Sequence, residues 1–103
     1  MANPIRIRAK NKDGLTEVLI LMPHPMETGL RKDDAGVSIP AHYITEIHVH
    51  TGSREVLKAR VSIAVSRDPL LLFRFQGGQI GDTMTVSWTD NRGDKRSDQT
   101  AIT

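Results

Sequence analysis

Apolar and polar residues alternate along much of the chain, with the two-residue period that is typical of half-buried β-strands. The alternation is clearest over 83–90, where three large apolar residues interleave with threonine and serine. The segment 15–22 is instead almost wholly apolar after Glu17, which predicts a strand covered on both faces. The expected strands are residues 5–10, 15–22, 42–50, 56–61, 70–75, 83–90 and 95–103.

The same alternation assigns side chains to faces. In the third expected strand, one face holds Tyr43, Thr45, Ile47 and Val49, and the other holds His42, Ile44, Glu46, His48 and His50. In the strand 70–75, we expect Leu71, Phe73 and Phe75 to point inward. The last strand is mostly polar, which suits an edge strand protected by charge.

Turn residues separate these segments at intervals of 8–15 residues. That spacing favours an all-β, immunoglobulin-like β-sandwich of about seven strands over a fold with parallel strands and helices. No window carries a 3.6-residue repeat. The chain has 103 residues, so one domain over 1–103 is expected. Aromatic residues make up only 4% of the chain, so isoleucine, valine and leucine must supply the core.

A long polar connection joins the second and third expected strands. It runs over residues 24–40, whereas connections of more than about 12–15 residues are usually functional or disordered. Gly29 and Gly36 can adopt positive φ, and residues 32–36 are typical of a chain reversal at the tip of a small hairpin. Because it combines an imidazole, a thioether, a carboxylate and a guanidinium, this connection is the first candidate for a functional segment.

Composition excludes several classes of function. Cysteine is absent, so the chain has no disulfide, no thiol nucleophile and no thiolate metal ligand. No apolar run reaches the length of a membrane span, and the N-terminus has no signal-peptide pattern, which by itself favours a cytoplasmic protein unless a partner carries the export signal. The net charge of +2 comes from interleaved basic and acidic residues, without the basic stripe of nucleic-acid binders.

The four histidines raise a metal hypothesis. His48 and His50 are two residues apart and would share a strand face, His42 lies farther along that face, and His24 is in the long connection. A copper or iron site on a β-sandwich would use such ligands. The competing interpretation is that a His-x-His pair on a strand is exposed surface, and no cofactor is expected.

Two residues of the connection have alternative roles. Glu27 could form an acid/base pair with His24, or it could form an ion pair with Arg31 and position the loop. We favour the pair with Arg31, because ion-pair networks also occupy loops. Met26 could be an exposed apolar contact for a partner, or it could fold inward to cap the open end of the sandwich. The sequence leaves the role of Met26 open.

The connection has the form H-x-M-E-T-G-x-R-x-D-x-x-G-x-x-I-P, and it resembles the Z subunit family of the sulfur-oxidation (Sox) carrier complex. Similarities outside it are the first strand at 4–9, the bend at 66–69 and the final hairpin at 81–94. The matching residues of the connection are His24, Met26, Glu27, Thr28, Gly29, Arg31, Asp33, Gly36, Ile39 and Pro40.

The resemblance implies a non-catalytic β-sandwich subunit that binds the Y subunit, SoxY, whose C-terminal cysteine carries thiosulfate-derived sulfur. It also implies a periplasmic location, reached by co-export with the signal-bearing partner, and transient contact with other Sox enzymes. No nucleic acid or membrane partner is expected. The candidate partner-binding residues are His24, Met26, Glu27, Thr28, Gly29 and Arg31. The alternatives are a small metal or redox protein using His24, His42, His48 and His50, and an immunoglobulin-like module with another ligand.

Overall fold

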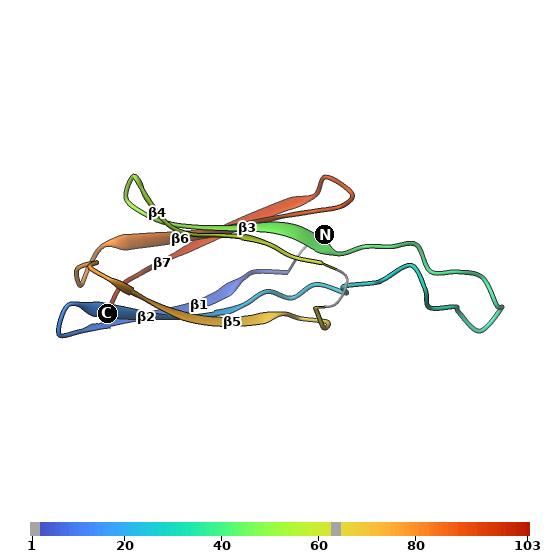
Figure 1. Ribbon diagram of the computed structural model, residues 1–103, viewed down its shortest axis with the longest axis horizontal. Coiled ribbons are helices and arrows are strands. Elements are labelled where there is room, and N and C mark those ends of the chain that lie inside the picture. The colour runs from blue at the N-terminus through green and yellow to red at the C-terminus, as the bar shows by residue number, and fades with distance from the viewer. Residues whose placement is uncertain (1–2, 63–64) are drawn as a thin grey trace.

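The computed structural model describes residues 3–62 and 65–103, which form two antiparallel β-sheets packed face to face (Figure 1). This confirms the predicted all-β sandwich with seven strands. The strands are β1 (Arg6–Lys12), β2 (Leu15–Leu21), β3 (Ile44–Thr51), β4 (Arg54–Arg60), β5 (Leu70–Gln76), β6 (Thr83–Asp90) and β7 (Lys95–Ala101).

One sheet has the order β1-β2-β5 and the other β4-β3-β6-β7. Tight turns join β1 to β2, β3 to β4 and β6 to β7, each at a glycine with positive φ, so three hairpins account for six of the strands. The polar strand β7 lies at a sheet edge, as its sequence predicts. Within the described part of the chain there is no helix that could cross a bilayer.

The core lies between the sheets and contains the predicted inward-facing residues of β5 and the large apolar residues of β6. Phe75 is buried and Leu71 and Phe73 pack against the cluster from the same face of β5. The buried apolar side chains are Ile5, Ala9, Val18, Ile20, Met22, Met26, Ile44, Ile47, Val49, Phe75, Met84, Val86, Trp88 and Ile102.

The assignment of faces in β3 was wrong at its start. Ile44 is fully buried together with Ile47 and Val49, although simple alternation places it on the opposite face. The pairing of β3 with β6 shifts register between Ile44 and Glu46, so Thr45 is the extra residue of a β-bulge. The bulge therefore inverts the alternation of side chains before it.

The expectation that β2 is covered on both faces was also wrong. Val18 and Ile20 are fully buried, but the alternate residues Leu19 and Leu21 are only half-buried and Leu15 is exposed. The outward face of this sheet has no layer over it in the structure (Figure 1). Its continuous apolar sequence therefore reflects a surface rather than a second core.

The long connection forms an arm, defined here as residues 23–43, that projects from one end of the sandwich (Figure 1). The arm accounts for much of the elongated shape of the molecule, which measures 54 × 20 × 19 Å. Figure 1 shows its two rails, the outgoing segment from β2 and the returning segment to β3, running side by side to a tip far from both sheets. The sandwich thus supports a projecting element at the end where β2 finishes and β3 begins.

Candidate functional site: the arm and its polar root

Backbone pairing holds the two rails of the arm together. The N–H of Glu27 donates to the carbonyl of His42 at 2.7 Å, and the reverse bond measures 2.9 Å. Farther out, the N–H of Ile39 donates to the carbonyl of Arg31 at 2.8 Å, and Lys32 forms an isolated bridge with Ser38. The arm is therefore an irregular two-stranded hairpin and not an unstructured loop.

Asp33 organises the tip of the arm. Its Oδ1 accepts hydrogen bonds from the N–H groups of Ala35 and Val37 at 2.9 and 3.0 Å, and Gly36 adopts a φ of 79°. These contacts confirm the predicted reversal at residues 32–36. The tip packs against no other element of the described chain, and Leu30 and Val37 are 81% and 60% exposed.

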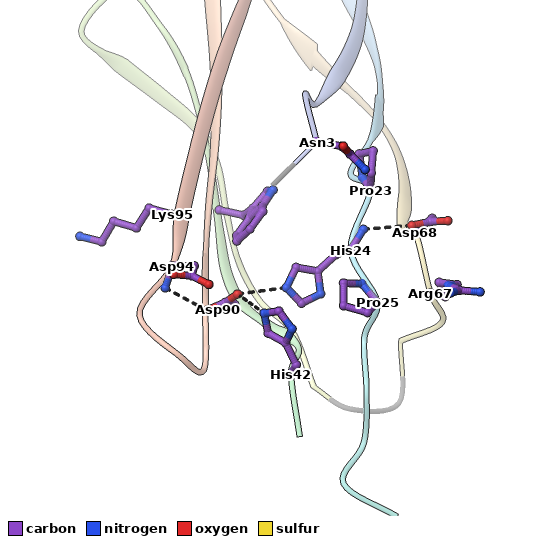
Figure 2. Close-up of a pocket in the computed structure, with 11 residues that line it drawn as sticks. Asn3, Pro23, His24, Pro25, His42, Arg67, Asp68, Asp90, Asp94 and Lys95 are labelled. Carbon is purple, nitrogen blue, oxygen red and sulfur yellow. Dashed lines mark hydrogen bonds and ion pairs between the residues drawn. The ribbon is translucent and has the colours of Figure 1, made fainter. Parts of the chain in front are cut away.

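Glu27 and Arg31 form an ion pair on the side of the arm. The Nε of Arg31 donates to Oε2 of Glu27 at 3.1 Å, and a second bond joins Nη2 to Oε1. Hydrogen bonding from Arg31 lowers the pKa of Glu27 below its ordinary value. The structure thus supports the predicted positioning pair over an acid/base pair with His24, whose ring points toward Asp90 (Figure 2).

A polar cluster of His24, His42 and Asp90 lies at the root of the arm (Figure 2). His24 lies near the start of the outgoing rail, His42 lies near the end of the returning rail, and Asp90 is the last residue of β6. Both rings approach the same oxygen, Oδ2 of Asp90, at 3.1 Å from Nε2 of His24 and 2.7 Å from Nε2 of His42. One buried carboxylate therefore ties both rails to the four-stranded sheet.

The hydrogen bonds fix the tautomer of His24. Its Nδ1 accepts the N–H of Met26 at 3.1 Å, so Nδ1 carries no proton. The proton of the neutral ring is on Nε2, which donates it to Asp90. The edge of the His24 ring also packs against Trp88, with ring centroids 5.0 Å apart.

Both oxygens of Asp90 are satisfied. Oδ1 accepts the N–H groups of Arg92 and Asp94, each at 3.0 Å, which shapes the β6–β7 turn. Burial opposes ionisation of Asp90, but the hydrogen bonds from His24, His42 and these two amides together hold its pKa below the ordinary value. Burial likewise lowers the pKa of His24, although the bond to Asp90 opposes it, so the stable form pairs a neutral His24 with an ionised Asp90.

These shifts predict a loss of stability in acid. A histidine with a lowered folded pKa contributes stability fully above its unfolded pKa of about 6.5 and loses it as the pH falls toward the folded value. Asp90 acts in the same direction at lower pH, because its contribution is lost as the pH falls through its folded pKa.

Urea midpoints at pH 7 and pH 5 should therefore differ more for the wild type than for His24→Gln. The matched control His50→Gln, at a ring on the sheet surface, should retain the wild-type difference. Equal differences in wild type and His24→Gln would contradict this assignment.

The cluster also has the composition of a metal site. Two histidines and a carboxylate offer ligand atoms within 4.8 Å of one another, a set that suits iron among other metals. A metal-bound histidine, however, donates its second ring N–H to an acceptor. The Nδ1 of His24 faces the N–H of Met26, which is a donor. This arrangement of hydrogen-bond donors and acceptors fits a closed hydrogen-bond network better than a metal centre.

The four-histidine metal site was wrong as a single site. His48 and His50 stack on each other in β3, with ring centroids 6.3 Å apart, and both lie near the carboxylate of Glu55. His42 belongs instead with His24 at the root, because the bulge in β3 inverts the alternation of side chains before it.

The six candidate partner-binding residues fall into two groups. His24 and Met26 are buried, and Sδ of Met26 accepts the N–H of Ile44 at 3.3 Å, so Met26 caps the end of the sandwich. The other four, Glu27, Thr28, Gly29 and Arg31, lie on the arm and remain at least partly accessible. Sequence reasoning missed Asp90, whose position at the end of a strand, directly before a turn, was its one available signal.

The fold and the site together define a small β-sandwich with a projecting hairpin whose two rails are clasped at the root. Within this structural class, the sequence identifies the family. The family model of sulphur oxidation protein SoxZ matches residues 5–101, and the chain belongs to that family. It is therefore a protein of the sulfur-oxidation system. No protein of curated function matches the chain significantly by sequence.

Solved structures with the same fold come from proteins of low sequence identity. A hypothetical protein from Pyrococcus horikoshii OT3 has 16% identity and a TM-score of 0.66, with 99% of this chain and 89% of that chain covered. A mutant superoxide reductase (neelaredoxin) from Archaeoglobus fulgidus has 18% identity and a TM-score of 0.66, with 100% and 91% covered. Superoxide reductase from Ignicoccus hospitalis has 15% identity and a TM-score of 0.62, with 98% and 80% covered. At these identities the likeness is one of fold alone.

Proposed function

We infer that this chain is the non-catalytic binding subunit of a SoxYZ-type carrier complex. It holds a SoxY-like subunit, called the carrier subunit below, whose cysteine bears the sulfur intermediates, and it helps present that subunit to other Sox enzymes. The observation that carries the proposal is the arm, because the residues of the family-like motif lie on an element that projects from the sandwich. Membership of the SoxZ family, whose model matches residues 5–101, also supports it.

The construction of the arm suits recognition. Its root is buried and fixed by Asp90, whereas its outer half is exposed and carries both apolar and charged side chains. A rigid support with an exposed tip lowers the entropy lost on binding, because the tip is already held in place. Arginine is also a frequent interface hot spot, and the ion pair with Glu27 already orients the guanidinium of Arg31.

The absence of cysteine is consistent with this role, because the sulfur cargo must then be held by the partner. The proposal extends to a periplasmic location, reached by export together with a partner that carries the signal. The superoxide reductases share the fold at too low an identity to favour an iron enzyme. The hydrogen bond from the N–H of Met26 to Nδ1 of His24 also argues against one.

Arg31→Ala should weaken binding of the carrier subunit or of a Sox enzyme while leaving the melting temperature nearly unchanged. The side chain of Arg31 is largely exposed, and exposed ion pairs contribute only about 0–1 kcal/mol to stability. Calorimetric titration against the carrier subunit, and against each Sox enzyme with the complex assembled, measures the first effect, and thermal unfolding measures the second. Arg60→Ala is the matched control, since Arg60 is an exposed arginine at the end of β4.

A large fall in melting temperature with unchanged binding would make Arg31 a structural residue and contradict its role in recognition. Absence of any binding by the wild type, with a properly folded carrier subunit, would contradict the proposed function itself.

A further inference from the structure

The outward faces of the two sheets differ sharply in chemistry. On the four-stranded sheet the outward residues of β6 and β7 are polar or small, and those of β3 include Glu46, His48 and His50. The outward residues of β6 and β7 are Thr83, Thr85, Ser87, Thr89, Lys95, Ser97, Gln99 and Ala101. That face is an ordinary solvated surface.

The outward face of the β1-β2-β5 sheet carries a square of four leucines, called the leucine square. Leu19 of β2 lies directly opposite Leu72 of β5, and Leu21 lies opposite Leu70. Leu70 and Leu72 are 65% and 59% exposed, and their two partners are half-buried. Four large apolar side chains in direct register form a contiguous patch, which on a soluble domain marks an interaction surface.

Basic residues border the leucine square along β1. Arg6 lies opposite Leu21, and Arg8 lies opposite Leu19. Lys10 and Lys12 continue the row of exposed bases, and none of the four is in an ion pair within residues 3–62 and 65–103. Glu17 is the one acidic residue of these three strands, and Arg74 already pairs with it at 2.8 Å. The surface is therefore apolar at its centre and positive along one side.

The leucine square lies in the half of the sheet nearest the arm. Leu21 ends β2 two residues before the arm begins, and Leu70 begins β5 opposite it. Figure 1 shows these strand ends leading into the side from which the arm projects. A partner seated on the square would reach the root of the arm without crossing the sandwich.

We propose that the outward face of the β1-β2-β5 sheet, centred on the leucine square, is the surface that the carrier subunit covers. This inference rests on the proposed function and adds where the partner binds. The partner should present an apolar patch bordered by aspartate or glutamate, which would pair with Arg6 and Arg8. Charge disfavours a second copy of this chain, because self-association would bring two net positive faces together.

Leu72→Glu and Arg8→Glu test the proposal in calorimetric titration against the carrier subunit. Leu72→Glu should weaken binding at least about tenfold, since it places a charge in the apolar centre of the interface. Arg8→Glu should weaken binding at least about threefold and reduce its salt dependence. Gln99→Glu is the control for Leu72→Glu, because it adds the same single negative charge on the outward face of the other sheet. Leu70→Ser provides a second test at the most exposed leucine of the square, should Leu72→Glu not fold.

Unchanged affinity in Leu72→Glu or Leu70→Ser, with tight binding by the wild type, would overturn this surface and leave the proposed function intact. No binding by the wild type would instead count against the proposed function. Sedimentation of the isolated chain separates the remaining outcome: a dimer that Leu72→Glu dissociates, with carrier affinity unchanged, would show that a second copy covers the face.

Discussion

Replacing Asp90 with asparagine is expected to lower the free energy of unfolding by about 2–4 kcal/mol, because the substitution removes a buried, hydrogen-bonded charge. The amide oxygen of asparagine can still accept the turn amides of Arg92 and Asp94. Its NH₂ group, however, is a donor, and it would face the two ring N–H groups of His24 and His42. Urea unfolding at pH 7 measures the loss.

The root cluster also predicts a local effect of Asp90→Asn. Hydrogen exchange at the amides of Glu27 and His42, which bridge the rails, should become faster than in the wild type. Asp94→Asn is the matched control, because Asp94 has an exposed side chain on the same turn, and its effect should stay within about 0.5 kcal/mol. Equal losses in the two variants would contradict the role of Asp90 as the clasp of the arm.

Met26→Ala is expected to cost about 2–5 kcal/mol, the range for truncation of a buried methionine. Met26 is buried at the end of the sandwich, and its sulfur accepts the amide of Ile44. Truncation leaves a cavity and also leaves that buried N–H without an acceptor. Thermal or urea unfolding measures the cost.

Leu30→Ala provides the comparison for Met26→Ala, since Leu30 lies on the same rail but is almost fully exposed. Its effect on stability should be within about 0.5 kcal/mol. If Met26→Ala were as mild as Leu30→Ala while carrier binding fell, Met26 would be a partner contact rather than a cap.

Much of the fold could be predicted because its signals are local. The two-residue period determines which residues of β5 and β6 face inward, and Gly93, with a φ of 83°, marks the β6–β7 turn. The reversal at the tip of the arm follows from the residues of the tip itself. Edge position could be predicted for β7 because a charged, polar strand is stable only where one side faces solvent.

The features that could not be predicted depend on distant contacts. His24 and Asp90 are 66 residues apart, so nothing near either residue announces their hydrogen bond. The bulge at Thr45 is set by pairing with β6, and it placed Ile44 in the core and His42 at the root. Periodicity also cannot distinguish a strand buried on both faces from one whose second, apolar face lies on the surface, which is why Leu19 and Leu21 were misassigned.

The arm and the leucine square support one mechanical account. The sandwich provides an apolar, positively bordered sheet face, and the clasp at Asp90 holds a projecting hairpin at the adjacent end. Binding through either feature would involve no covalent chemistry on this chain. In the proposed function, the sheet face would bind the carrier subunit and the arm would help present it to other Sox enzymes.

Native mass spectrometry of this chain co-expressed with the carrier subunit tests the central claim most directly. The account predicts a dominant species with the summed mass of one copy of each chain, stable through purification. Recovery of the two chains only as separate species, although each is folded, would contradict it.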